Sequence, residues 1–253
     1  MNVRREVRGQ VGHVVLDRPR ARNAVTVELA RELADAVDDL GSRSRVVVLR
    51  GAGADFCAGG DVGALAALHA RGREATAELF AAFRAACRAI ETAPVPVVAA
   101  VHGHAVAGGF ELVQSADLAV VEADARIADI HCRYGQVPGG GSTQRLPRIL
   151  GRPRAMGLIL TGETISGRQA AEWGLAYRVA EPGELDRVVD EVVDMLLANS
   201  CPAMARSKFL VNRSSTTPLD DGLDLETRHV LDHLATEAET AFAAFTDRKT
   251  VHP

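Results

Sequence analysis

The chain has 253 residues, enough to bury one sizeable core, which favours a single α/β domain with a helical tail over two independent domains. Its formal net charge is −4 with 25% charged residues, so no broad cationic field is present to attract nucleic acid. No apolar run approaches the roughly 20 residues that span a bilayer, and the N-terminus lacks the apolar segment of a secretory signal. We therefore expect a cytoplasmic protein without a membrane partner.

The first half of the chain alternates strand-like and helix-like segments. Short runs rich in β-branched residues predict strands at 11–18, 46–51, 97–101 and 117–121. Between them, Thr26 is expected to cap a helix over residues 27–40, and an Ala-rich helix is expected over 73–92, ended by two prolines. This alternation predicts a mostly parallel sheet with right-handed crossover connections.

The second half of the chain is mainly helical. From about Arg145 onward the strand signal fades, apart from residues 176–180. Apolar residues at helical spacing predict helices over 152–160, 167–173, 184–199, 202–213 and 219–246. The last of these carries many apolar side chains, so we expect it to pack against its own chain or a neighbouring subunit. The chain is therefore divided into an α/β core, residues 1–195, and a C-terminal helical region, residues 196–253.

Two glycine-rich loops each follow a buried strand and precede a helix. They are GAGADFCAGGDV, residues 51–62, and HGHAVAGGFEL, residues 102–112. At the carboxyl ends of parallel strands, such loops form the usual ligand crevice. Glycine lets the backbone approach a ligand closely, and a helix N-terminus offers free N–H groups. Two N–H groups aimed at one point would make an oxyanion hole, in which each donor lowers a reaction barrier by about 3–4 kcal/mol.

A third glycine-rich loop, residues 134–148, precedes a helix for which Ser142 or Thr143 is the expected cap. This loop lacks the G-K-[ST] of a P-loop, and the 51–62 loop lacks the spacing of a dinucleotide fingerprint. The four cysteines are scattered and form no C-x-x-C pair, so we expect neither a metal site nor a disulfide framework.

Six motifs follow one another along the chain. They are LDRPRARNAV near 16–25, DFCAGGDV at 55–62, VHGHAVAGGFEL at 101–112, ADLAV at 116–120, GQVPGGGSTQRLPRILG at 135–151 and LTGETISGRQAAEWGLAYRV at 160–179. In this order they resemble the crotonase (enoyl-CoA hydratase/isomerase) superfamily over nearly the whole chain. The resemblance implies an α/β spiral of repeated ββα units, with a C-terminal helical region that serves trimerisation. It also implies a homotrimer or dimer of trimers and an acyl-CoA substrate, with coenzyme A as part of the substrate and no bound cofactor.

The resemblance also implies roles for individual residues. By position, the oxyanion amides fall on Ala58 and Gly108. Contacts with coenzyme A are implied for Arg20, Arg22, Ala24, Gly59, Gly60, Asp61 and Gly109. Near the C-terminus, Arg248 and Lys249 resemble basic residues that approach the coenzyme A phosphates. The two histidines that flank the second loop, His102 and His104, are interpreted as packing residues.

Family hydratases use two glutamates, one to activate water and one to exchange the Cα proton. Glu111 occupies the first position, one helical turn beyond Gly108, so its carboxylate can face the same cavity. The second position falls on His131, seven residues before Pro138, where a hydratase carries glutamate. An imidazole can exchange a proton near neutrality. Asp129, on the same side if the backbone is extended, could orient the ring or act in its place.

Three functions remain open on the sequence. The first is an enoyl-CoA hydratase-like lyase, or an isomerase, that uses Glu111 and His131 around an oxyanion-stabilised enolate. The second is a hydrolase that cleaves a C–C bond of a β-diketone or β-ketoacyl substrate, because histidine at this position also resembles the 6-oxocamphor hydrolase branch. That branch and the dehalogenase branch carry aspartate where this chain has Gly140. The third is a catalytically inactive partner subunit, which the presence of Glu111 argues against.

Overall fold

The computed structural model describes the backbone of residues 1–250, with side chains described up to residue 237 and at Phe242. The chain forms two compact units, residues 1–198 and the segment that begins at Asn199. Every strand of the described chain belongs to the first unit, and the described part of the second unit is helical.

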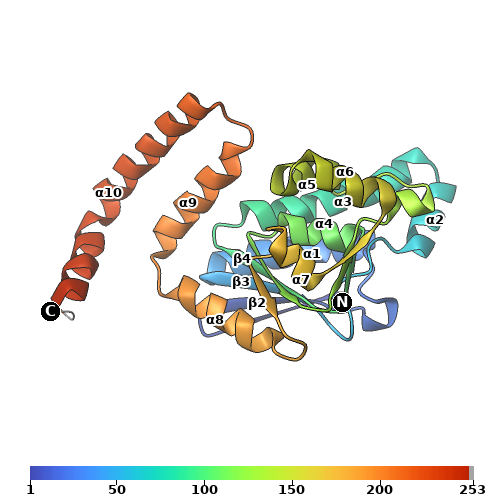
Figure 1. The fold of residues 1–253 in the computed structure, drawn as a ribbon, viewed down its shortest axis with the longest axis horizontal. Helices are drawn as coiled ribbons and strands as arrows, with labels where there is room; N and C mark the ends of the chain where they lie inside the picture. The colour runs from blue at the N-terminus through green and yellow to red at the C-terminus, as the bar shows by residue number, and fades with distance from the viewer. Residues whose placement is uncertain (251–253) are drawn as a thin grey trace. The chain divides into compact units, whose positions relative to one another are not determined.

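A largely parallel sheet forms the centre of the first unit (Figure 1). Within the described residues its six strands are, in spatial order, β1 (Val3–Arg8), β2 (Val11–Leu16), β3 (Val46–Gly51), β4 (Val97–Val101), β6 (Leu118–Glu122) and β9 (Arg178–Ala180). β1 pairs antiparallel with β2, and every later pair of neighbours is parallel. The predicted parallel sheet is confirmed. Its central strands β3 and β4 are buried almost throughout, as expected of strands covered on both faces.

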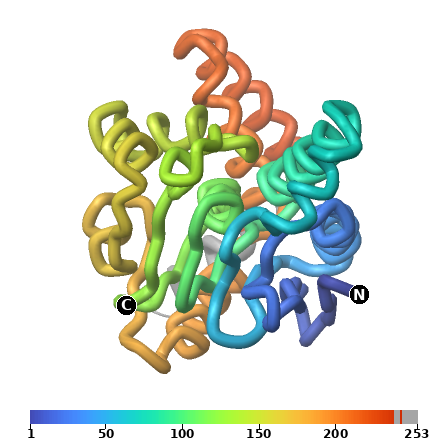
Figure 2. The backbone as a smooth tube through the Cα atoms, turned by 90° about the vertical axis from the view of Figure 1, so that its right-hand side faces the viewer, coloured from blue at the N-terminus to red at the C-terminus, as the bar shows by residue number. Residues whose placement is uncertain are grey.

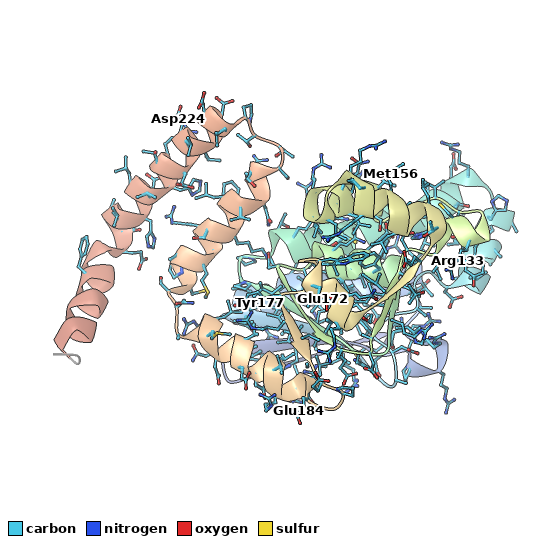
Figure 3. The ribbon with its side chains drawn as sticks, in the orientation of Figure 1. Arg133, Met156, Glu172, Tyr177, Glu184 and Asp224 are labelled. Carbon is cyan, nitrogen blue, oxygen red and sulfur yellow. The ribbon has the colours of Figure 1, made fainter. Side chains whose placement is uncertain are left out.

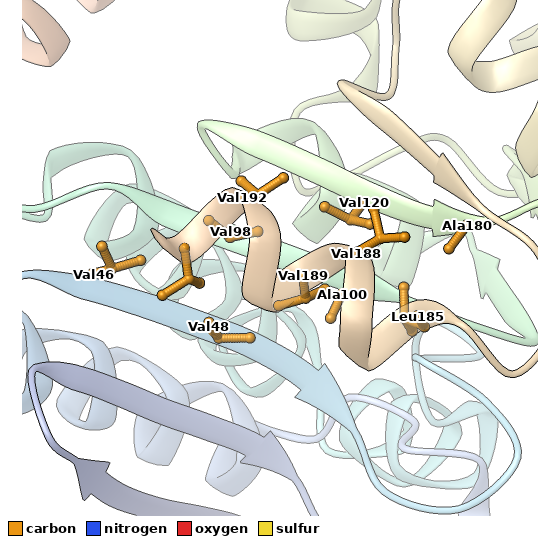
Figure 4. Packing of buried hydrophobic residues seen from close by; sticks show 11 residues of the cluster. Val46, Val48, Val98, Ala100, Val120, Ala180, Leu185, Val188, Val189 and Val192 are labelled. Atoms are coloured by element: carbon orange, nitrogen blue, oxygen red, sulfur yellow. The ribbon is translucent and has the colours of Figure 1, made fainter. Parts of the chain in front are cut away.

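Helices cover both faces of this sheet. As Figure 4 shows, α8 (Leu185–Leu197) packs its valines against Val46 and Val48 of β3 and against residues of β4, β6 and β9. Because strand side chains alternate, the intervening residues of β3 face the other side, where α1 (Val27–Arg43) and α3 (Arg73–Thr92) lie (Figure 1). Thr26 caps α1 as predicted.

Three very short strands form a second sheet in the same unit. Within the described residues they are β5 (His104–Val106), β7 (Arg126–Ala128) and β8 (Thr164–Ser166), with β5 parallel and β8 antiparallel to β7. The pairs β4–β5 and β6–β7 each lead from the large sheet to the small one and are followed by a helix, α4 (Gly108–Ser115) or α5 (Ser142–Leu150). These are the expected ββα units. The sequence did not predict the three strands, because three residues are too few for an alternating pattern.

The remaining elements of the first unit include the predicted helices α2 (Val62–Ala70), α6 (Arg152–Thr161) and α7 (Gly167–Glu172) and two short 3-10 helices, η1 (Pro19–Ala21) and η2 (His131–Tyr134), that were not predicted. In Figure 2 the blue and teal helices α1 to α3 and the yellow helices α5 to α7 lie on either side of the central green segments. One predicted cap is wrong. Neither Ser142 nor Thr143 caps α5, since Gly141 precedes its first residue without a side-chain bond, and Ser142 Oγ instead accepts a hydrogen bond from Gln114.

In the described residues the second unit consists of α9 (Cys201–Ser214) and α10 (Leu219–Thr250). Several large apolar side chains on these helices are exposed, among them Val211, Leu223 and Leu231. A run of exposed apolar groups is typical of a surface that contacts a protein partner. In the part of the chain that is described, no helix is both long and apolar enough to cross a membrane.

Candidate active site

A cavity of about 640 Å³ is bordered by α2, α3, α4, η2 and the small sheet. Its apolar lining comes largely from α2 and α3, through Leu65, Leu79, Phe80 and Phe83. The polar groups that converge on it include the Glu111 and His131 side chains and the backbone of Gly60 and Gly108. An apolar cavity with a few converging polar groups is typical of a small-molecule site.

Glu111 lies in the first turn of α4, and its side chain is 1% exposed. Its Oε1 accepts hydrogen bonds from the backbone N–H of Gly140, at 2.8 Å, and of Ser142, at 3.0 Å. These two bonds anchor one carboxylate oxygen. The other, Oε2, lies 3.9 Å from Nε2 of His131.

His131 begins η2, and its Nδ1 lies 2.7 Å from Oδ1 of the fully buried Asp129. This contact gives the ring one orientation, with Nδ1–H donating to Asp129 and Nε2 directed toward Glu111. The expected pairing of Asp129 with His131 is therefore present. The backbone between the two residues is not extended, because Ile130 has φ −95° and ψ 6°.

Burial and charge act on this pair in opposite directions. Burial raises the pKa of Glu111, and the Ser142 N–H, the His131 charge and the Gly140 N–H offset only part of that rise. Burial lowers the pKa of His131, but the hydrogen bond to Asp129 and the charges of Asp129 and Glu111 outweigh it, so the pKa is raised. A carboxylate and an imidazole perturbed in this way are typical of a general acid–base site.

Two backbone N–H groups also face the cavity. Gly108 is the first residue of α4, so its N–H has no carbonyl partner within the helix. Gly60 forms a parallel bridge with Val25 in which Gly59 O and Asp61 N make the hydrogen bonds, so the Gly60 N–H points away from Val25. Among the described residues neither N–H donates a hydrogen bond. A Cβ placed on Gly108 would lie 3.6 Å from the Gly60 nitrogen, so the two glycines face one another.

This geometry corrects one of the two predicted oxyanion donors. The N–H of Ala58 donates to the carbonyl of Arg22 at 2.9 Å, so it is not available to a substrate. The prediction for Ala58 is wrong, and Gly60, two residues further along, presents the unpaired N–H. Sequence position could not separate the two residues, because their hydrogen bonds depend on the 18–25 segment that packs beside the loop.

Asn23, which no sequence pattern assigned to the site, holds that segment and the first glycine loop together. Its side chain is fully buried, and Nδ2 lies 2.8–3.2 Å from the carbonyl oxygens of Ala52, Asp55 and Phe56. Its Oδ1 accepts a hydrogen bond from Arg18 N at 2.9 Å. The residue has φ 57°, a conformation that asparagine adopts more readily than most residues. The one available signal was an asparagine inside the LDRPRARNAV motif.

Comparison with known proteins places this arrangement in a family. Residues 6–252 match the model of the enoyl-CoA hydratase/isomerase family. The chain belongs to this family. It is 31% identical to the short-chain-enoyl-CoA hydratase of Clostridium acetobutylicum, across 99% of this chain and 96% of the relative.

Solved structures agree with the assignment. An enoyl-CoA hydratase from Bacillus anthracis superposes with a TM-score of 0.92 at 29% identity, over 98% of this chain and 97% of that one. A candidate enoyl-CoA hydratase from Thermobifida fusca, solved in complex with acetoacetyl-CoA, superposes with a TM-score of 0.85 at 30% identity, over 93% and 95%. The predicted crotonase fold is confirmed, and the protein is an enzyme of the enoyl-CoA hydratase/isomerase family.

In the present protein, only some of the residues expected to contact coenzyme A line the cavity. Arg22 lines the cavity, and its Nε donates to Asp55 at 2.7 Å. Arg20 is exposed in η1 and does not line the cavity, whereas the carbonyl of Ala24 accepts from the Arg18 side chain. Asp61 caps α2 through Ala64 N at 3.0 Å and forms an ion pair with Arg18 at 3.0 Å. Its role in the fold is therefore structural.

The two remaining glycines are packing positions. Gly59 has φ 94°, which favours glycine, and its carbonyl accepts from Val25 N at 2.7 Å. At Gly109 a Cβ would lie 2.1 Å from the carbonyl oxygen of Cys57, so only glycine lets α4 approach the first loop. Arg248 and Lys249 lie in the last turns of α10, and their side chains are outside the described residues.

Polar residues around the second loop do more than the sequence suggested. His102 Nε2 lies 3.0 Å from Gly53 O, and His104 Nδ1 lies 2.6 Å from Asp55 Oδ1, so both rings make polar contacts that the packing interpretation did not include. Arg133, labelled in Figure 3, also lines the cavity and was not predicted. Its Nε donates to Thr161 O at 3.4 Å, at the C-terminal end of α6.

Proposed function

We propose that the protein is a hydratase-type lyase that adds water across the Cα–Cβ double bond of a 2-enoyl-CoA thioester. The observation that carries the proposal is the position of Glu111 and His131, 3.9 Å apart beside the unpaired N–H groups of Gly60 and Gly108. A buried acid–base pair next to two amide donors supplies what a reaction through an enolate needs.

In the proposed reaction the thioester oxygen accepts hydrogen bonds from Gly60 and Gly108. When the oxygen of water bonds to Cβ, electron density moves through Cα to this oxygen and an enolate forms. Donors fixed beforehand cost no reorganisation, and each contributes about 3–4 kcal/mol in a comparable oxyanion hole. The N-terminal end of α4 adds the positive end of a helix dipole.

The two proton transfers are assigned to the acid–base pair. Glu111 Oε2 accepts a proton from the attacking water, and the His131 imidazolium donates its Nε2 proton to Cα, which gives the 3-hydroxyacyl thioester. One water has then been added, with Glu111 left protonated and His131 neutral. Return of the proton across the 3.9 Å gap, relayed by a water, resets the pair. Asp129 accepts the Nδ1–H hydrogen bond and so stabilises the imidazolium.

Substrate binding and assembly complete the proposal. Coenzyme A is placed along Arg22 and Gly60, the two of its expected contacts that line the cavity, with no further cofactor. The cavity position of Arg22 and Gly60 and the acetoacetyl-CoA complex of the Thermobifida fusca relative support this placement. We assign residues 196–253 to trimerisation, because α9 and α10 carry exposed apolar side chains. The proposed assembly is a trimer or a dimer of trimers, and the proposed location is the cytoplasm.

A second candidate is hydrolytic cleavage of a C–C bond in a β-ketoacyl thioester. The Asp129–His131 contact favours it, because a carboxylate-bound imidazole can also activate water as a base. The environment of Gly140 opposes it. A Cβ there would lie 2.2 Å from Phe83 Cε1 and 2.7 Å from Glu111 Oε2, so the aspartate that the β-diketone hydrolase branch carries has no room.

A substrate screen tests these functions against one another. The purified protein is assayed with crotonyl-CoA, 3-butenoyl-CoA, 3-hydroxybutyryl-CoA and acetoacetyl-CoA, with products separated by chromatography. Interconversion of crotonyl-CoA and 3-hydroxybutyryl-CoA is the expected result. Conversion of 3-butenoyl-CoA alone would identify an isomerase, and release of acetate from acetoacetyl-CoA would identify the hydrolase. Turnover of none of them would overturn the proposal for short acyl chains.

A further inference from the structure

Asp55 lies at the junction of three chain segments that surround the candidate oxyanion hole. The residue is 8% exposed and sits in the first glycine loop. Its Oδ1 accepts hydrogen bonds from the backbone N–H of His104, at 3.0 Å, and from His104 Nδ1, at 2.6 Å. Its Oδ2 accepts from Arg22 Nε at 2.7 Å. One carboxylate therefore joins the 18–25 segment, the 51–62 loop and the start of β5.

These same segments carry both unpaired N–H groups. Gly60 follows Asp55 by five residues, and Gly108 follows His104 by four. The loop is tied to β5 by hydrogen bonds between Cys57 N and His104 O, at 2.9 Å, and between Val106 N and Cys57 O, at 3.1 Å. Isolated bridges, rather than a continuous ladder, hold the loop to its two neighbours. The spacing of the two amides is therefore set by how these irregular segments pack.

The chemistry of this junction calls for a carboxylate. Four N–H donors, two from Arg22 and two from His104, converge on two oxygens, and an asparagine would replace one acceptor oxygen with a donor that faces them. Burial raises the pKa of Asp55, but the hydrogen bonds from Arg22 and His104 outweigh it and lower the pKa to about 2. Asp55 thus stays anionic across the working pH range. Arg22 compensates its charge, which would otherwise oppose an enolate nearby.

The backbone at Gly103, next to the Asp55 junction, requires glycine. Gly103 has φ 57°, and a Cβ there would lie 2.0 Å from Ala54 O and 2.9 Å from Asp55 Oδ1. Only glycine at this position lets the chain enter β5 with His104 N–H directed at the carboxylate. Asp55 therefore binds both the backbone N–H and the side chain of His104, and Gly103 makes the backbone contact possible.

We propose that Asp55 is a positioning residue of the oxyanion hole, which sets the separation of the Gly60 and Gly108 amides by holding Arg22 and His104 on one carboxylate. The inference rests on the proposed function, since it concerns the same two amides. Asp55 touches no reacting atom in this account and acts through the backbone on either side of it. A misplacement of such donors by about 1 Å can cost on the order of a hundredfold in rate.

Asp55→Asn tests the proposal, with Asp17→Asn as the matched control. Asp17 accepts from Arg4 Nε at 2.7 Å, the same bond as that between Asp55 and Arg22, but on the exposed surface. For a folded Asp55→Asn protein we expect kcat on crotonyl-CoA to fall roughly 10- to 100-fold, with KM within about threefold of wild type. Asp17→Asn should retain wild-type values. Unchanged kcat in Asp55→Asn would overturn the proposal, as would a rise in KM with unchanged kcat, which would make Asp55 part of the coenzyme A site.

A second pair of variants covers a failure of Asp55→Asn to fold. His104→Asn keeps a side-chain N–H near the position of Nδ1, whereas His104→Ala removes it. We expect His104→Ala to lower kcat and His104→Asn to recover most of it. Equal rates in the two variants would count against the role of this bond.

A spectroscopic measurement separates this inference from the proposed reaction. An oxyanion hole stabilises the enolate of bound acetoacetyl-CoA, which absorbs in the near ultraviolet, whether or not the enzyme hydrates any substrate. We expect the band in the wild-type protein and in Asp17→Asn, and a weaker band in Asp55→Asn at saturating ligand. A band of wild-type strength in Asp55→Asn would refute the positioning role. Absence of hydration with the band present and sensitive to Asp55 would overturn only the proposed reaction.

Discussion

Replacing His131 with asparagine removes the proposed proton donor, Nε2, while keeping a side-chain hydrogen bond to Asp129. Asparagine Nδ2 can occupy the place of His131 Nδ1, which lies 2.7 Å from Asp129. Nothing then remains at the position of Nε2, 3.9 Å from Glu111. The variant therefore tests proton transfer while keeping a side-chain hydrogen bond to the fully buried Asp129, which alanine would remove.

The expected loss is in kcat. General acid–base catalysis contributes about 10²- to 10⁴-fold, so His131→Asn should lower kcat on crotonyl-CoA by a factor in that range. KM should change little, because the cavity residues of α2 and α3 and the two amides are untouched. His131→Ala should lose a similar factor in kcat and, in addition, about 1–3 kcal/mol of stability, because it removes the side-chain hydrogen bond to the buried Asp129 carboxylate.

The pH profile gives a sharper test than the rate alone. The reaction needs Glu111 anionic and His131 cationic, and the pKa of each group is raised. Activity should rise as pH passes the Glu111 pKa, above the usual carboxyl range, and fall as pH passes the His131 pKa, above its usual value of about 6.5. In His131→Asn the alkaline fall should vanish. The acid limb should move to higher pH, because the His131 charge that lowers the pKa of Glu111 is gone.

The assay is the loss of the conjugated thioester absorbance of crotonyl-CoA, measured from about pH 5 to about pH 9, with circular dichroism as the check on folding. A folded His131→Asn protein with wild-type rates and an intact alkaline limb would refute the reasoning. The proton at Cα would then pass through Glu111 alone, and His131 would be a residue that shapes the cavity.

Four further predictions follow from the same geometry. Gly108→Ala should lower kcat by about 10²- to 10³-fold with the fold intact, since the added methyl lies 3.6 Å from Gly60 N, where a substrate oxygen would bind. A folded variant with normal kcat would contradict the oxyanion assignment. Asn23→Ala should cost about 3 kcal/mol in chemical denaturation, because it removes the bonds to three carbonyls and to Arg18 N; a loss below about 1 kcal/mol would show that the loop holds without them. Asp55 has a pKa lowered to about 2, so its carboxylate should add up to about 2 kcal/mol to the free energy of unfolding above pH 4, and this contribution should be lost as pH falls toward 2. A stability difference between wild type and Asp55→Asn that persists at pH 2 would contradict this. Light scattering at micromolar concentration should return a trimer or hexamer mass, and a monomer mass would rule out the assigned role of α9 and α10.

The local parts of the fold could be predicted from the sequence because each rests on a pattern a few residues long. The helix over residues 73–92 coincides with α3, and the strands at 46–51 and 97–101 coincide with β3 and β4. Apolar spacing, β-branched runs and the prolines that end a helix act on neighbouring residues, so no tertiary information is needed. The order of the motifs along the chain likewise indicated the family.

What only the tertiary structure decided is where individual N–H groups and side chains find partners. Sequence position placed Glu111, His131 and Gly108 at one cavity, but it could not show that the Ala58 amide is already bound to Arg22 while the Gly60 amide is unpaired. Nor could it show that Asp55 and His104, 49 residues apart, share a hydrogen bond of 2.6 Å. Hydrogen bonds between distant segments depend on how those segments pack, and a sequence pattern reports only on neighbours along the chain. The residue types therefore indicated the chemistry of the site, and the packing of the 18–25 segment, the 51–62 loop and the start of β5 decided its geometry.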